Sequence, residues 1–149
     1  MKQIYYTLQF TGGAAPKAGA TGVMKATTSA SSCSMTTAIG PEGVNGTLQT
    51  IAGGTATFES EVTLKSESSF DESGTIRFGS GNSALRFSTV GQGFMGPSAN
   101  PKLQHGSVMW RVDGGEGQFA GATGLITSNF TLSDKGEVTD NHFGIIFVK

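Results

Sequence analysis

Alternation of apolar and polar residues at every second position is the feature that most constrains this chain. Residues 55–65 show it most clearly, because Ala56, Phe58, Val62 and Leu64 share one face while hydroxyl and charged residues occupy the other. Successive side chains of a β-strand point to opposite faces, so a period of two predicts a strand with one buried face. No segment shows the 3.6-residue period of an amphipathic helix. The sequence therefore predicts an all-β protein.

Eight to ten strands are expected, separated by turn residues such as Gly, Asn and Pro. They fall at residues 2–10, 22–28, 32–39, 47–51, 55–65, 75–78, 84–90, 106–113, 125–132 and 138–148. Residues 91–103 contain two Pro and three Gly and are predicted to form a long loop. Short turns favour antiparallel neighbours, and closure would remove sheet edges that few charges guard. We expect one domain, residues 1–149, forming a closed antiparallel β-barrel of about eight strands; a β-sandwich is the alternative.

The low charge of the chain limits its partners. Charged residues make up 14% of the sequence, the net charge is −1, and Lys and Arg form no cluster. Nucleic acid and anionic membrane surfaces are therefore not expected as partners. No apolar run approaches the ~18 residues of a membrane-spanning helix. Residues 1–6 lack the apolar core of a signal peptide, and the single Cys33 allows no internal disulfide, so a cytoplasmic location is expected.

Residues 114–124, Gly-Gly-Glu-Gly-Gln-Phe-Ala-Gly-Ala-Thr-Gly, are the most distinctive segment. A nucleotide-binding loop is excluded because the glycine spacing differs from the dinucleotide fingerprint and no Lys occupies the P-loop position. The residues that follow also continue as a strand rather than a helix. The segment is therefore predicted to be a tight crossing between two late strands, with Phe119 inserted into the core.

This segment and the strands before it carry a resemblance to a known superfamily. Gly-Thr-Ile-Arg-Phe at 74–78, Ala-Leu-Arg-Phe-Ser-Thr-Val-Gly at 84–91 and Val-Met-Trp-Arg-Val at 108–112 lead into the glycine-rich run. Together they resemble the calycin-like barrels, and within them the allene oxide cyclase and dirigent superfamily, over residues 74–132. The resemblance implies an eight-stranded barrel with an apolar cavity, and an oligomer. It transfers no catalytic residue to this chain.

Polar residues that interrupt the apolar register of a strand are candidate ligand-binding residues, because in a barrel they would point inward. Four residues share this property: Tyr6, Ser60, Ser128 and Asn141. Ordinary packing with hydrogen bonds to the backbone is the alternative for each. Trp110 is also assigned to the ligand site. Phe94 and Met95 are expected to form an adaptable apolar lip at the cavity mouth, or to be buried by a partner subunit.

Acid–base chemistry would have to come from the opposite registers, which hold most charged residues. His142, Glu61 and Arg111 are the candidate catalytic residues. The alternative places all three in solvent or at a subunit contact. The chain has two His, one Cys and no Gly-x-Ser-x-Gly motif, so neither a metal site nor a serine nucleophile is expected, and no cofactor is predicted.

Three functions remain open from the sequence. The first is an isomerase, cyclase or lyase that orients a small apolar substrate in a cavity. The second is a non-catalytic carrier of a small apolar ligand, and the third is a structural or interaction protein with a solid core. Low surface charge and Thr-rich strands favour a homo-oligomer, either a dimer or a trimer.

Overall fold

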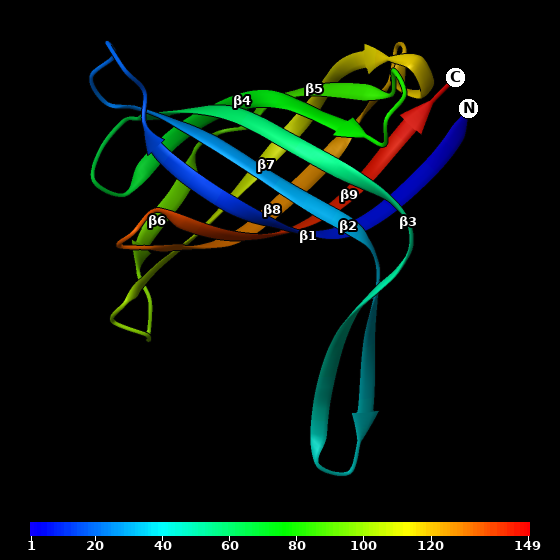
Figure 1. Cartoon of the computed structure of the whole chain (residues 1–149), viewed down its shortest axis with the longest axis horizontal. Helices are drawn as coiled ribbons and strands as arrows, with labels where there is room; N and C mark the ends of the chain where they lie inside the picture. Colours follow the sequence, from blue (N-terminus) through cyan, green and yellow to red (C-terminus); the bar gives the residue numbers. More distant parts are fainter.

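Strands account for 76% of the chain in the computed structural model, which describes all of residues 1–149 (Figure 1). Their bounds are β1 Lys2–Pro16, β2 Val23–Gly40, β3 Gly43–Leu64, β4 Ser69–Phe78, β5 Ala84–Thr89, β6 Gly93–Pro97, β7 Leu103–Glu116, β8 Thr123–Ser133 and β9 Glu137–Val148. The only helical segment is one 3₁₀ turn, Gly117–Phe119. The all-β prediction is therefore confirmed, and no helix is long and apolar enough to cross a membrane.

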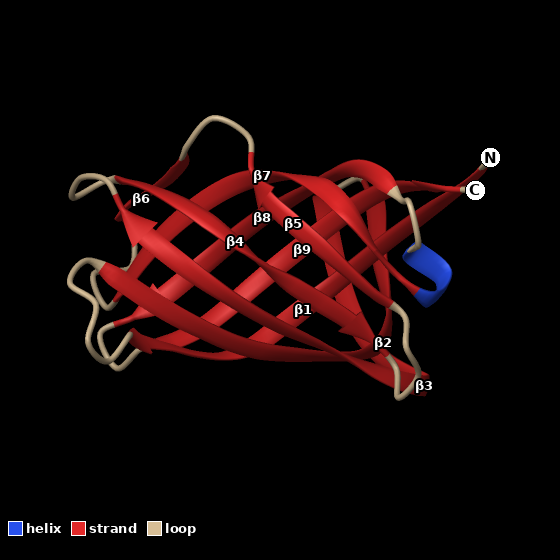
Figure 2. Ribbon diagram, turned by 90° about the horizontal axis from the view of Figure 1, so that it is seen from above, coloured by secondary structure: helices blue, strands red, loops and turns tan.

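All strands belong to one antiparallel sheet whose hydrogen bonding forms a ring. The order is β3-β2-β1-β9-β8-β7-β5-β4, and β4 pairs back onto β3. The short β6 lies beyond β5 and pairs with the same two neighbours, β4 and β7. Figure 2 shows the strands running obliquely to the long axis, with loops gathered at the two ends. This arrangement gives every strand an inward and an outward face.

Three segments differ from the sequence prediction. Residues 91–103 are not one long loop, because they include β6. The strands predicted at 22–28 and 32–39 form one strand, β2, which continues through a bulge between Ser31 and Cys33. Likewise, β3 continues through the predicted turn at Gly53-Gly54. From Cys33↔Thr50 to Ser31↔Thr55 the register moves two residues along β2 and five along β3, and pairing resumes on both sides. The glycine pair at 53–54 therefore lies in an irregularity of a continuous strand and not at a strand end.

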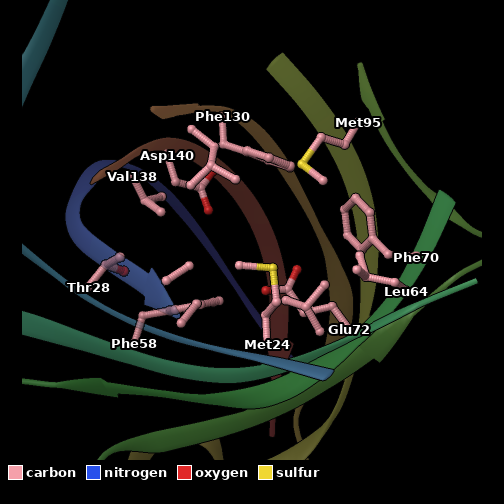
Figure 3. A pocket seen from close by; sticks show the side chains of 14 residues that line it. Met24, Thr28, Phe58, Leu64, Phe70, Glu72, Met95, Phe130, Val138 and Asp140 are labelled. Atoms are coloured by element: carbon pink, nitrogen blue, oxygen red, sulfur yellow. The ribbon is translucent and has the colours of Figure 1, made fainter. Parts of the chain in front are cut away.

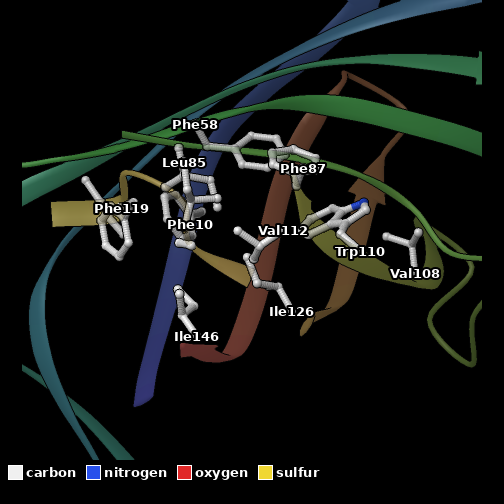
Figure 4. Close-up of a cluster of buried hydrophobic side chains, with 14 of the residues drawn as sticks. Phe10, Phe58, Leu85, Phe87, Val108, Trp110, Val112, Phe119, Ile126 and Ile146 are labelled. Atoms are coloured by element: carbon white, nitrogen blue, oxygen red, sulfur yellow. The ribbon is translucent and has the colours of Figure 1, made fainter. Parts of the chain in front are cut away.

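The core lies inside the ring and is rich in aromatic side chains (Figure 4). Phe58 stacks on Phe87 at a ring-centroid distance of 5.3 Å, and Phe87 contacts Trp110 at 4.4 Å. Each buried large side chain contributes about 1.5–3 kcal/mol of transfer free energy. The prediction for Phe119 is confirmed. It is the last residue of the 3₁₀ turn, it is buried, and its ring centroid lies 5.2 Å from that of Phe78.

Candidate functional site

The inward face of β9 carries the first half of the candidate site. Asp140 and His142 are both buried on this face, and His142 Nε2 lies 2.9 Å from Asp140 Oδ2. The ring of His142 is enclosed by aromatic side chains, with centroid distances of 4.4 Å to Phe10, 5.1 Å to Trp110 and 5.4 Å to Phe58. This packing holds the imidazole in one orientation against the Asp140 carboxyl group.

A chain of hydrogen bonds extends from this pair to both neighbouring strands. Ser128 on β8 donates to Asp140 Oδ1 at 2.6 Å, and Tyr6 Oη on β1 lies 3.4 Å from His142 Nδ1. In the neutral tautomer whose Nε2–H is donated to Asp140, Nδ1 accepts from the Tyr6 hydroxyl. Burial raises the pKa of Tyr6 above its usual value, with a smaller contribution from the negative charge of Asp140, so the phenol stays a donor.

Glu72 on β4 forms the second half of the site. Its carboxyl group is buried, and Ser60 on β3 donates to its Oε1 at 2.6 Å. Burial raises the pKa of Glu72 to about 8, and the nearby Asp140 charge also raises it, whereas the Ser60 hydroxyl and the Trp110 indole lower it. The indole N–H of Trp110 is buried and has no hydrogen-bond partner. Glu72 is therefore a neutral acid at pH 7.

Both carboxyl groups border one pocket at the end of the ring where β1 and β3 finish and β4 and β9 begin (Figure 3). Of its 14 lining residues, 11 are hydrophobic, and the set is Ala14, Met24, Ala26, Thr28, Phe58, Val62, Leu64, Phe70, Glu72, Met95, Phe130, Leu132, Val138 and Asp140. The pocket has a cavity volume of about 60 Å³, within about 570 Å³ of empty space that includes the part open to solvent. It is therefore a small and partly open pocket.

Thr28 adds an unpaired polar atom to this lining. Its Oγ1 is buried and has no hydrogen-bond partner in the chain. A buried hydroxyl without a partner costs about 1–3 kcal/mol, so this atom favours a polar group placed beside it. The site thus combines an apolar wall, one free hydroxyl, one neutral acid in Glu72 and one carboxyl group in Asp140 that accepts two hydrogen bonds. Such a combination suits the binding of a small apolar molecule and the transfer of its protons.

Several residues predicted from sequence do lie in the interior. The inward direction is confirmed for Tyr6, Ser60, Trp110 and Ser128, and each belongs to the network around Asp140 and Glu72. Met95, expected at the cavity mouth or under a partner subunit, lines the pocket.

The expected orientations of His142 and Asn141 are wrong. His142 is inside rather than on the outer register, and its neighbour Asn141 is exposed and bonded to Gln9. Phe94, expected at a cavity mouth or under a partner subunit, is 50% exposed and packs near His105. The error on β9 has a simple cause: both of its registers contain large apolar residues, and the more aromatic register faces outward.

Glu61 and Arg111 do not join His142. Both face outward and border one shallow polar depression on the outer surface. Glu61 forms an ion pair with Lys17, whose hydrogen bond and charge lower the pKa of Glu61. Arg111 Nε binds Asp113 Oδ1 at 2.9 Å. Exposed pairs of this kind contribute little to stability, because solvent screens the charges, and they mark no enclosed site.

Glu72 and Asp140 were missed from the sequence, although a signal for them exists. Glu72 lies on the same face of its strand as the buried Phe70 and Ile76. Asp140 likewise shares a face with the buried Ile146 and Val148. A carboxylate in an apolar register is unusual, because burial disfavours its charged form. No group of three or more His, Cys, Asp or Glu side chains converges in a way that would hold a metal ion.

Comparison with family models, with curated protein sequences and with solved structures finds no match for this chain. The function therefore has to be argued from the interior site itself.

Proposed function

We propose that the ring of strands is a closed, calycin-like barrel whose pocket binds a small apolar molecule and isomerises or cyclises it by acid–base catalysis. The observation that carries this proposal is the pairing of two buried carboxyl groups, Glu72 and Asp140, in one apolar pocket. Their surroundings differ: Glu72 is neutral at pH 7 because burial raises its pKa to about 8, while Asp140 accepts hydrogen bonds from Ser128 and His142. Two carboxyls with different surroundings supply an acid and a base.

In the proposed reaction Glu72 donates its proton, or a short hydrogen bond, to a carbonyl oxygen of the substrate. Asp140 removes a proton from a carbon next to that carbonyl, and the proton returns at another carbon. The substrate keeps its formula, so no oxidant or cofactor is needed. A cyclisation uses the same groups, with proton addition at one position and proton loss at another.

His142 does not border the pocket, and we assign it as a positioning residue. It contacts Asp140 from behind, where its Nε2–H and the Ser128 hydroxyl fix the plane of the carboxyl group. Tyr6 fixes the imidazole in turn. A base held in a fixed orientation relative to the bound substrate lowers the entropic part of the reaction barrier.

The small volume and the mostly apolar lining of the pocket suit a small apolar ketone, part of which can extend through the open mouth. Two methionines, Met24 and Met95, line this space, and their unbranched side chains adapt to ligands of different shape. Thr28 Oγ1 offers a hydrogen bond to a second polar group of the substrate.

The test uses cyclohexanone as a probe. The protein is incubated with it in D₂O, and exchange of the protons next to the carbonyl is followed by NMR. We expect exchange faster than in buffer, reduced at least tenfold by Glu72→Gln and by Asp140→Asn. Trp110, the single tryptophan, packs on the pocket residue Phe58 and reports binding through its fluorescence.

Glu61→Gln is the matched control, because it changes a carboxylate of the outer surface. It should leave both exchange and binding unchanged. If the wild-type protein binds the probe but does not accelerate its exchange, the carrier function is favoured instead. If it neither binds the probe nor accelerates exchange, the small-molecule site is refuted.

A further inference from the structure

The middle of the chain forms a two-stranded arm, residues 33–50, that extends away from the rest of the molecule. Figure 1 shows it as the long hairpin of β2 and β3 that projects from the end of the ring near the two termini. Its strands pair with each other from Cys33↔Thr50 to Gly40↔Gly43 and with no other strand. Every residue from Met35 to Thr50 is exposed. A hairpin without a third strand is marginally stable in water, so this arm needs another surface.

The arm has one apolar face and one polar face. Met35 pairs with Leu48 and Ile39 pairs with Val44, so these four side chains share one face. Their exposed fractions run from 39% for Met35 to 87% for Ile39. The other face holds only Ser, Thr, Ala, Asn, Gln and Gly. A two-faced strand pair is expected where one face is buried, and here nothing in the same chain buries it.

A second unpartnered apolar surface lies on the outside of β1, β9 and β8. Tyr5 pairs with Ile145, which pairs with Leu125, so the three form one row across the strands. Phe143 and Phe147 flank this row on β9. Tyr5 is 65% exposed, Leu125 48% and Phe143 44%. We call these five residues the outer patch. Contiguous apolar patches of this kind mark interaction surfaces in soluble proteins.

The outer patch adjoins an open sheet edge. β1 pairs with β9 from Lys2 to Gly13 but with β2 only from Thr11 to Pro16. The edge of residues 2–10 on the β2 side is therefore unpaired, because β2 leaves the ring here to form the arm. Unpaired edges are normally guarded by charges, and residues 3–10 have none. The arm carries one charge, Glu42 at its tip.

We propose that the partner is a second copy of this chain, and that the apolar face of each arm packs on the outer patch of the other copy. Both surfaces are apolar and nearly free of charge, and both lie at the same end of the ring. This end is opposite the pocket mouth, so the contact leaves the pocket open. Each chain thus has an uncovered apolar face on its arm and an uncovered outer patch, and in a pair of chains the two can cover each other.

The area of contact selects a reciprocal dimer over a ring of three. The eight residues of one arm strand span about 26 Å, and two strands are about 10 Å wide. One arm face therefore covers about 260 Å², and one arm–patch contact removes roughly 500 Å² from water in total. Specific interfaces need about 1,000 Å² or more. Two reciprocal contacts in a two-fold dimer reach this value, whereas the single contact per interface of a ring does not.

The test measures the mass of the full chain in solution by light scattering after size-exclusion chromatography. We expect twice the chain mass of 15.3 kDa. Ile39→Glu on the arm and Tyr5→Glu on the outer patch should each give the monomer. Thr36→Glu, on the polar face of the arm, is the matched control and should leave the dimer intact. Trp110 fluorescence verifies that each variant is folded.

The Tyr5→Glu chain distinguishes arm–patch from arm–arm contact, because it keeps its arm and alters only the patch. It should be monomeric if each arm packs on the outer patch, and it should stay dimeric if two arms pack on each other. A wild-type monomer would overturn the proposal, and so would a Tyr5→Glu chain that stays dimeric.

Discussion

Glu72 makes the stability of this protein depend on pH in an unusual direction. The pKa of its buried carboxyl is raised from 4.5 to about 8 in the folded chain. Below pH 4.5 the group is protonated in both the folded and the unfolded chain, and it contributes its full stability. Between pH 4.5 and about 8 the carboxyl group ionises only in the unfolded chain. Each rise in pH within this range therefore lowers the free energy of the unfolded chain relative to the folded chain. This contribution to stability is therefore lost as the pH rises.

The magnitude follows from the two pKa values. One pH unit between them changes the free energy of unfolding by about 1.4 kcal/mol, and the interval from 4.5 to about 8 corresponds to about 5 kcal/mol in total. A whole domain is stable by only about 5–15 kcal/mol. Glu72→Gln keeps the size of the side chain and an oxygen that accepts the Ser60 hydrogen bond, but it does not ionise. The variant should lose this dependence on pH.

The assay is urea unfolding of both proteins in unit pH steps between about 5 and 9, followed by Trp110 fluorescence. The free energy of unfolding of the wild type minus that of Glu72→Gln should fall by about 1.4 kcal/mol per pH unit up to about pH 8 and then level off. The difference isolates Glu72, because all other titrating groups are shared. The same difference at every pH would show that Glu72 is ionised in the folded chain, and the neutral-acid assignment would then be wrong.

Three further substitutions test the hydrogen bonds and the packing of the interior. Ser128→Ala removes a hydrogen bond to the buried Asp140 and should cost about 1–3 kcal/mol in urea unfolding; a neutral result would contradict that bond. Gly144→Ala places a Cβ 2.2 Å from a Tyr6 ring carbon and should cost about 1–3 kcal/mol, measured by thermal unfolding; an unchanged melting temperature would contradict the close packing. Phe119→Ala should cost about 3–5 kcal/mol by the same measurement, and a loss under 1 kcal/mol would refute its role as a core plug.

The interior of the site was partly visible in the sequence. Ser60 and Ser128 interrupt otherwise apolar registers, and this rule placed both correctly. The same rule applied to β4 would have found Glu72, which lies in one register with Phe70 and Ile76. It failed on β9 because Phe143 and Phe147 make the outward register look like the buried one. A strand with two apolar registers does not reveal which one faces inward.

The arm shows the same limit for the fold. The turn signal at Gly53-Gly54 suggested a strand end, whereas β3 continues through it from the arm into the ring. Whether a glycine pair ends a strand or lies within one depends on the strand beside it, and here that strand is β2.

Local patterning alone determined the all-β class, most strands and the buried position of Phe119, because a period of two and a glycine-rich crossing act over a few neighbouring residues. Only the tertiary structure decided that Glu72, Asp140 and His142 meet, because they come from β4 and β9 and their proximity depends on the ring of pairings. The tertiary structure also decided the rise of the Glu72 pKa to about 8, because its causes are burial and neighbouring groups that are distant in the sequence.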